Sequence, residues 1–340
     1  MAPAVRGWLL LVWALIFAMV LVGGITRLSG SGLSIVEWQP LTGAIPPLTD
    51  ADWNAAFDAY KASPQYREVN RWMSLGDFQR IFVWEYVHRL LGRAIGAFVL
   101  LPWLYFAWRR RMSPALAGKT AGLFVLGALQ GLLGWYMVRS GLVNEPRVSH
   151  FRLAAHLALA FGTGALVLWL ALDGFYVRER SQRLAPARIV AVCALLALLA
   201  VQVVYGAFMA GTHAGHYYAT FPDLNGHYLP GPSFTGPSLI ADAVNRPTAI
   251  HYLHRLFGWL TFAYSIGLWV FLRRVEPRPH VWRCAALVAA LAFVQFNLGA
   301  LTVVQRVDFP FALAHQALAY LLVSSGVLLL HSAYGTKSRS

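Results

Sequence analysis

Charged residues are scarce in this sequence. Asp, Glu, Lys and Arg make up 12% of its 340 residues, whereas 58% are hydrophobic, and the mean hydropathy is +0.54. A typical soluble domain carries roughly twice that share of charge, so water is not the main solvent of this chain. The basic residues stand in short stretches between apolar segments rather than along one groove. This distribution argues against a nucleic-acid-binding protein.

Cysteine is almost absent. The two cysteines, Cys193 and Cys284, both lie within long apolar stretches, where a thiol usually behaves as a small hydrophobic side chain. The sequence therefore excludes a disulfide-stabilised scaffold, a cysteine-rich zinc site and an exposed redox pair.

Long apolar stretches dominate what is present. There are eight, at about 8–25, 81–106, 119–138, 153–172, 188–210, 249–272, 283–304 and 311–332. Each approaches or exceeds the roughly 20 residues that a spanning helix needs. The sequence thus predicts an all-α integral membrane protein with eight transmembrane helices.

Basic residues predict the orientation of these helices. Arginine clusters such as 109–111 and 273–274 fall in the loops on the side of the two termini, whereas the opposite side carries as many acidic as basic residues. By the positive-inside rule, both termini are expected to be cytoplasmic. No small-residue cleavage site follows the first apolar stretch, and no Arg- and Ser-rich leader precedes it. We therefore expect a retained first helix in a multi-pass protein of the bacterial cell inner membrane.

Internal repeats indicate a duplication. Three motifs occur twice and in the same order: Tyr-x-His-Arg-Leu-x-Gly at 86–92 and 252–258, Gln-x-x-Leu-Gly at 130–134 and 295–299, and Ala-His-x-Ala at 155–158 and 314–317. Ionisable residues are rare at membrane depth, so their recurrence is unlike a chance match of apolar letters. We predict two tandem, pseudo-symmetric four-helix bundles, comprising residues 1–180 and 181–340.

Four histidines lie at matched depths near the outer ends of the predicted helices: His88, His156, His254 and His315. Two imidazoles that face each other across a four-helix bundle can ligate a haem iron from both sides. Glycines one or two turns after the first histidine of each pair, Gly92, Gly96 and Gly258, could leave a slot for the flat ring. Zinc or copper is the competing interpretation, and haem fits the glycines better.

The two repeats differ at one position that bears on function. Glu85 stands one turn before His88, and His251 occupies the equivalent place before His254. A carboxylate inside a membrane span is costly and usually functional, and we interpret Glu85 as a catalytic proton acceptor or electrostatic stabiliser. The alternative is a hydrogen-bonded partner of Arg89, Arg93 or a histidine. We expect the first half to perform chemistry and the second to pass electrons.

The remaining basic and imidazole side chains give weaker signals. Arg89 and Arg255, and arginines at helix ends such as Arg27, could pair with haem propionates. His213, His216 and His227 lie in the second long outer loop, residues 211–248. They are either solvated loop residues or metal ligands. The first long outer loop, residues 26–80, is expected to include a short amphipathic interfacial helix near 50–62.

Two runs of the sequence resemble a known family. The run TRLSGSGLSIVEWQPLTG at 26–43 and the run WEYVHRLLGR at 84–93 are similar to those of haem A synthases of the mitochondrial and proteobacterial branch, and the similarity covers nearly the whole chain. The cysteine pair that the Gram-positive branch has in its first outer loop is missing. The resemblance therefore excludes thiol-linked electron delivery of that type.

The resemblance implies a specific activity. Members oxidise the C8 methyl group of haem O to the formyl group of haem A, through a hydroxymethyl intermediate, for cytochrome oxidase. By this resemblance His88 and His156 bind the substrate haem, Glu85 is required for the oxidation, and His254 and His315 ligate a haem b cofactor. Membrane lipid, haem O synthase and an electron-transfer protein are the implied partners.

Two other functions remain open from the residues alone. A di-haem membrane cytochrome would carry electrons without catalysis, and an unpaired acid at Glu85 would argue against it. A haem transporter or chaperone would be favoured by discontinuous helices, yet the apolar stretches look continuous.

Overall fold

The computed structural model describes residues 1–39, 42–143, 145–178, 183–228, 234–236, 238–334 and 336–338. Eight helices of the described part are long and apolar enough to cross a membrane. They are α1 (Pro3–Leu28), α3 (Leu75–Trp108), α4 (Pro114–Gly141), α5 (His150–Leu172), α6 (Pro186–Gly211), α8 (Pro247–Val275), α9 (Pro279–Val304) and α10 (Phe309–Ala333). Each contains the core of one predicted apolar stretch. The predicted class, an all-α membrane protein with eight spans, is confirmed.

Local sequence explains where these helices begin. Proline stands in the first turn of α1, α4, α6, α8, α9 and α10, where its missing N–H costs no helical hydrogen bond. The helix α3 instead begins with a capping box. The Ser74 hydroxyl accepts the Asp77 backbone N–H at 3.3 Å, and the Asp77 carboxylate accepts the Ser74 N–H at 3.1 Å. These caps satisfy donors that a helix start leaves unpaired.

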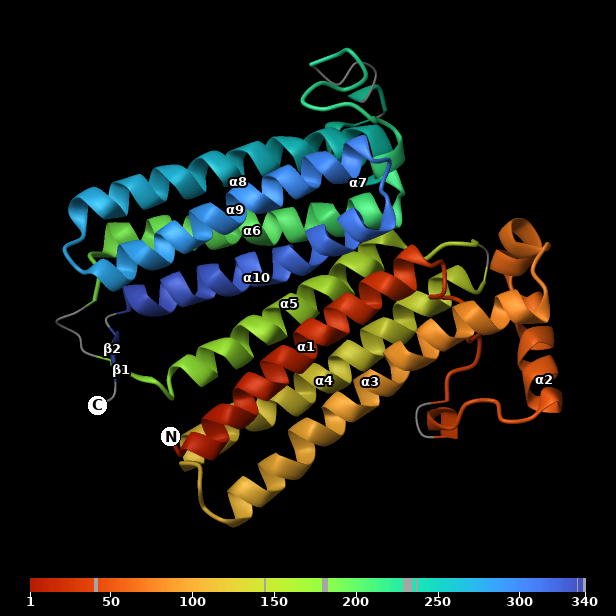
Figure 1. Cartoon of the computed structure of the whole chain (residues 1–340), viewed down its shortest axis with the longest axis horizontal. Helices are drawn as coiled ribbons and strands as arrows, with labels where there is room; N and C mark the ends of the chain where they lie inside the picture. The colour runs from red at the N-terminus through yellow and green to blue at the C-terminus, as the bar shows by residue number, and fades with distance from the viewer. Residues whose placement is uncertain are drawn as a thin grey trace.

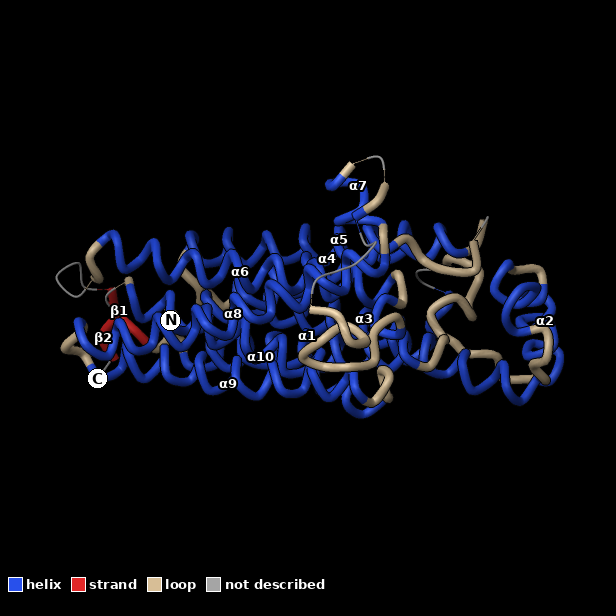
Figure 2. Tube along the Cα trace, turned by 90° about the horizontal axis from the view of Figure 1, so that it is seen from above, coloured by secondary structure: helices blue, strands red, loops and turns tan. Residues whose placement is uncertain are grey.

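The eight helices run roughly along one axis in two neighbouring groups (Figure 1). The groups are α1, α3, α4 and α5 from the first half of the sequence, and α6, α8, α9 and α10 from the second. Where the groups meet, α5 contacts α6 and α10, and α1 contacts α10. Both chain termini lie at one end of the bundle and α2 lies at the other (Figures 1 and 2).

Polar contacts join the two groups at this junction. The Gln316 side-chain amide on α10 donates to the Val20 carbonyl on α1 at 2.7 Å. Deeper in the bundle, the Trp13 indole donates to the Ser324 hydroxyl at 3.3 Å. The buried ring of Tyr320 packs beside Trp13 at 5.8 Å between centroids. The junction therefore combines apolar packing with hydrogen bonds that specify its register.

The end opposite the termini carries the long loops. Their short elements are η1 (Thr42–Ala44), α2 (Asp50–Lys61), the π-helical turn η2 (Tyr66–Asn70), η4 (Ala214–His216) and α7 (Leu239–Asn245). The predicted helix near 50–62 is α2. Its buried side chains Phe57 and Tyr60 stack on Phe78 of α3 at 5.1 and 5.2 Å between centroids. The apolar face of α2 therefore packs on an extension of α3.

The other end holds a feature that the sequence did not predict. Strand β1 (Tyr176–Arg178) pairs antiparallel with β2 (Thr336–Ser338), with Val177 opposite Lys337. This short ladder ties the connection between α5 and α6 to the chain end after α10. It links the two helix groups on the side of the termini.

The outer surface of the bundle is apolar. Large side chains such as Leu101, Val125 and Trp108 are 64%, 61% and 78% exposed. A soluble protein would rarely leave such a continuous apolar surface uncovered. It matches the surface that hydrocarbon covers in a membrane protein, since lipid tails are as apolar as the side chains.

Candidate functional site: two histidine pairs near the loop end

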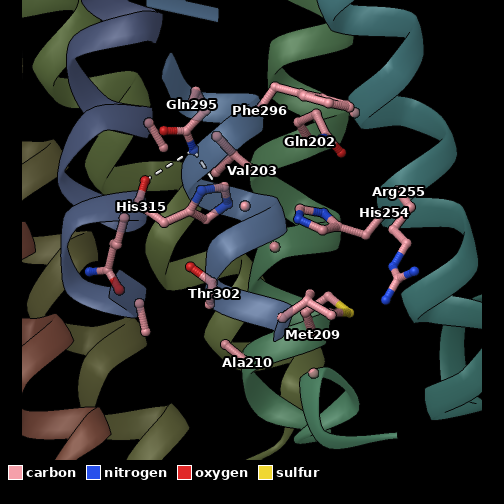
Figure 3. Close-up of a pocket in the computed structure, with 18 of the residues that line it drawn as sticks. Gln202, Val203, Met209, Ala210, His254, Arg255, Gln295, Phe296, Thr302 and His315 are labelled. Carbon is pink, nitrogen blue, oxygen red and sulfur yellow. Dashed lines mark hydrogen bonds between the residues drawn. The ribbon is translucent and has the colours of Figure 1, made fainter. Parts of the chain in front are cut away.

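His254 of α8 and His315 of α10 point toward each other across the second helix group (Figure 3). Their ring centroids lie 6.4 Å apart and their planes are inclined by 82°. Two metal–nitrogen bonds of about 2.0 Å, with roughly 1.1 Å from each nitrogen to its ring centre, would separate the centroids by about 6 Å. The predicted pair is thus brought together at the spacing of two ligands on one iron atom.

Unpaired polar atoms support the fit of a metal-centred group. Nδ1 of His254 and Nδ1 of His315 are buried and have no hydrogen-bond partner in the described part of the chain. Buried imidazole nitrogens are normally satisfied. These two nitrogens are therefore free to ligate an iron, whereas Nε2 of His315 lies 3.4 Å from the Gln295 amide.

The space around these rings is a cavity of about 250 Å³. Its lining includes the glycines Gly206, Gly258 and Gly299. A Cβ at Gly299 would lie 2.9 Å from Cε1 of His315, and one at Gly206 would lie 3.6 Å from Cε1 of His254. Glycine at 299 is therefore required for this position of the His315 ring, because a real Cβ does not tolerate so close a contact.

The glycines predicted to form haem slots have different surroundings. Gly258 lines the cavity, as expected. Gly92 packs against the Met19 side chain of α1, which would lie 3.3 Å from an added Cβ, and Gly96 has open space beside it. Gly206 and Gly299, which also line the cavity, were not predicted from the sequence to do so. The repeated Gln-x-x-Leu-Gly motif carried the signal for Gly299.

The same type of contact recurs at the other histidine pair. A Cβ at Gly23 of α1 would lie 3.3 Å from Nε2 of His88, and a Cβ at Gly134 of α4 would lie 3.1 Å from Cε1 of His156. His88 and His156 therefore occupy surroundings like those of His254 and His315.

The repeated glutamines hold the histidines of α5 and α10. The Gln130 amide donates to the His156 carbonyl at 3.1 Å, and the Gln295 amide donates to the His315 carbonyl at 3.0 Å. Each amide also lies near its histidine ring, at 3.2 and 3.4 Å from Nε2. Figure 3 shows the contacts between Gln295 and His315. The repeat is visible in the sequence, but this positioning role of the glutamines was not predicted from it.

Glu85 is buried, with 3% of its surface exposed, and both of its carboxylate oxygens accept hydrogen bonds. Its carboxylate accepts the Ser34 hydroxyl at 2.7 Å, the Ile35 backbone N–H at 2.8 Å, and the Arg89 guanidinium at 2.7 Å. The expectation of an unpaired intramembrane acid is therefore wrong, and the alternative of a partner for Arg89 is confirmed. These donors, together with the Arg89 Nε–H at 3.1 Å, offset the cost of burying the charge. A catalytic role for Glu85 stays a prediction.

His251 performs the equivalent function in the second group. Its Nδ1 lies 2.9 Å from the carbonyl oxygen of Ala214, and its Nε2 accepts the Arg255 Nε–H at 2.9 Å. This arrangement places the imidazole proton on Nδ1. Glu85 and His251 thus both connect an arginine on the same helix to an outer loop.

The two arginines expected to contact propionates hold outer-loop carbonyls. Arg89 donates to Ile35 and Glu37 at 2.7 and 2.9 Å. Arg255 donates to the carbonyls of Asp223 and Tyr218 at 2.6 and 3.3 Å, and it also lines the cavity. Most of their N–H groups are occupied by protein acceptors. Their predicted contact with propionates stays a prediction.

The second-loop histidines do not form a metal centre in the described part of the chain. The rings of His213 and His216 stack with centroids 6.4 Å apart, and no group of three or more His, Cys, Asp or Glu side chains that could hold a metal ion occurs among the described residues. Partial desolvation of its ring and the positive charges of Arg27 and Arg147 lower the pKa of His213 to about 4. His213 is therefore neutral at physiological pH.

The chain is similar to proteins of one family along nearly its whole length. A family model described as cytochrome oxidase assembly protein, COX15-CtaA, matches residues 6–327. The Heme A synthase of Nitrosospira multiformis is 44% identical over 332 residues, covering 95% of this chain and 92% of the relative. The Heme A synthases of Nitrosomonas eutropha and Rhodopseudomonas palustris are 41% and 43% identical, covering 94% and 99% of this chain and 91% and 93% of the relatives. The chain belongs to the COX15-CtaA family of cytochrome oxidase assembly proteins.

Proposed function

We propose that this protein is a haem A synthase that oxidises the C8 methyl group of haem O to a formyl group through a hydroxymethyl stage. The observation that carries this proposal is the presence of two histidine pairs with matching glycine and glutamine contacts in a chain whose relatives are named Heme A synthase. The conversion is a four-electron oxidation. The protein must therefore bind a haem substrate in the membrane and pass electrons and protons away from it.

The substrate site is assigned to the first helix group. His88 and His156 would hold the iron of haem O, with the glycines at 23 and 134 leaving room for their rings. Glu85, one turn before His88, fixes the first outer loop through Ser34. In this proposal residues 1–180 form the substrate half and Glu85 assists the oxidation as a proton acceptor or electrostatic stabiliser.

The second helix group is assigned a resident haem b. His254 and His315 have the spacing, the unpaired nitrogens and the adjoining cavity that such a group requires. When bound there, haem b supplies one-electron redox chemistry. Gln295 fixes the backbone of the His315 turn, and Arg255 fixes the loop above His254. Residues 181–340 would therefore form the electron-transfer half.

The membrane and the partners follow from the same assignment. The chain would lie in the bacterial cell inner membrane with both termini cytoplasmic, so the histidine pairs lie toward the periplasmic face. Haem O synthase would supply the substrate, and a separate redox protein would accept the electrons. A hydrophobic product such as haem A would leave through the lipid or by direct transfer.

The test is to express the protein in a bacterium without cytochrome oxidase, with and without a source of haem O, and to identify the extracted haems by chromatography and mass. We expect haem A or its hydroxymethyl intermediate only when haem O is supplied, and neither in His88→Ala. His227→Ala, in an exposed loop position, is the matched control and should leave the product unchanged. Haem b alone under both conditions would contradict the proposal and favour a di-haem electron carrier.

A further inference from the structure

The cavity beside His254 and His315 is apolar over most of its surface and basic at one end. Among the described residues that line it there is no Asp or Glu, whereas Arg27 and Arg255 both line it. A ligand that fills this space would be apolar along most of its length and anionic where these side chains gather.

Arg27 reaches this cavity from the other helix group. It lies in the last turn of α1, and its guanidinium donates to the Ala210 carbonyl of α6 at 2.5 Å. Ala210 follows Gly206, which faces His254, by one turn of α6. At 1.5 Å per residue, the Arg27 contact lies about 6 Å closer to the loop end than the level of the His254 ring. In Figure 3, Ala210 stands on the side of the cavity away from Gln202.

The charge of Arg27 has no protein counter-charge in the described part of the chain. Its one hydrogen bond there is to a neutral carbonyl, and none of the ion pairs found there includes it. Arg255 differs, because three of its nitrogens donate to His251, Asp223 and Tyr218. A partly buried guanidinium without an anion is costly in an apolar region. Arg27 therefore has both the unused donors and the charge to bind a carboxylate.

We propose that Arg27 of the first helix group binds a propionate of the haem held by the second helix group. This inference deepens the proposed function and rests on its haem site at His254 and His315. A tetrapyrrole dicarboxylate carries its two acidic groups along one edge of a flat apolar ring, as the cavity requires. Guanidinium groups bind carboxylates through two parallel hydrogen bonds. The haem site of the second half is then incomplete without α1 of the first.

The experiment compares haemin with haemin dimethyl ester, in which both propionates are esterified. The full-length protein is produced in a haem-auxotrophic host in a His88→Ala background, so that only the His254 and His315 pair can take up haem through two histidines. Affinities are measured by absorbance titration in detergent. We expect the parent to bind haemin at least about tenfold more tightly than the ester, and Arg27→Gln to bind the two with nearly equal affinity.

Two further variants sharpen the outcome. Arg139→Gln, which removes a positive charge from the loop end of α4 outside the cavity lining, should retain the full discrimination. Arg27→Lys should retain part of it, because a point charge replaces a bidentate donor, and it decides the question if Arg27→Gln does not fold. Unchanged discrimination in the folded Arg27 variants would overturn the proposal.

A failure of the haem assignment would give a different result from a failure of the Arg27 proposal alone. If the parent binds no haemin with the low-spin spectrum of two axial histidines, or if His315→Ala leaves that spectrum unchanged, the haem b site itself is contradicted and the Arg27 proposal falls with it. If the spectrum depends on His315 while the ester binds as tightly as haemin, only the Arg27 proposal fails.

Discussion

The guanidinium of Arg89 lies 2.7 Å from the carboxylate of Glu85, one turn earlier on α3. The same pair reaches the first outer loop, because Arg89 holds the Ile35 carbonyl and Glu85 holds the Ser34 hydroxyl. A buried acid with so many donors has a structural role whether or not it also takes part in catalysis. The two roles can be separated by experiment.

Glu85→Gln removes the charge and Ser34→Ala removes one loop hydrogen bond while keeping the carboxylate. If Glu85 is catalytic, Glu85→Gln should lower haem A formation by about 100-fold or more, whereas Ser34→Ala should lower it only a few-fold and cost about 1 kcal/mol of stability. Product analysis and thermal unfolding in detergent measure the two effects. Equal losses of product in both variants would assign Glu85 to positioning of the loop alone.

Gly299→Ala should displace the His315 ring. The added Cβ would lie 2.9 Å from Cε1 of His315, whereas Gly267 on α8 has open space around it. We expect Gly299→Ala to lose most of the low-spin haem signal. Gly267→Ala should keep the signal and be neutral or stabilising by up to about 1 kcal/mol, since alanine is the better helix former. A normal haem spectrum in Gly299→Ala would show that the helices α9 and α10 adjust to the extra methyl group.

Gln316→Leu should weaken the junction between the helix groups. It removes the 2.7 Å hydrogen bond to the Val20 carbonyl, which keeps its helical hydrogen bond within α1, at a cost of about 0.5–1.5 kcal/mol. Asn297→Leu is the control, because in the described part of the chain the Asn297 amide bonds only to the Phe293 carbonyl of its own helix. Thermal unfolding of the purified variants checks the prediction, which is wrong if Gln316→Leu unfolds no earlier than Asn297→Leu.

The stability of the protein should fall with acidification through His213. Its folded-state pKa of about 4 lies below the ordinary value of 6.5, so the unfolded chain binds a proton more readily than the folded one. The resulting loss of folding stability is therefore absent above pH 6.5, grows as the pH falls, and is complete near pH 4. His213→Asn, which tolerates the positive φ of 53° at this position, should flatten this decline. His227→Asn should leave the unfolding temperature as a function of pH unchanged, and an identical profile for all three proteins would contradict the prediction.

The amino-acid sequence by itself determined the eight membrane helices, the four histidines and the family. Hydropathy follows from local composition, because about 20 consecutive apolar residues suffice to span hydrocarbon. The repeated motifs placed His88, His156, His254 and His315 at similar depths without any knowledge of packing. These properties are encoded along the chain, so they can be read from it.

The tertiary structure decided what each polar side chain touches. The sequence placed Glu85 near Arg89, yet only the folded loop brought the Ser34 hydroxyl and the Ile35 N–H to its carboxylate. The sequence likewise listed Arg27 among several basic residues, and only the packing of α1 against α5 and α10 placed it in the cavity of the other half. Such contacts join residues far apart in the chain, and they depend on helix rotation and crossing, which side-chain packing sets across whole interfaces.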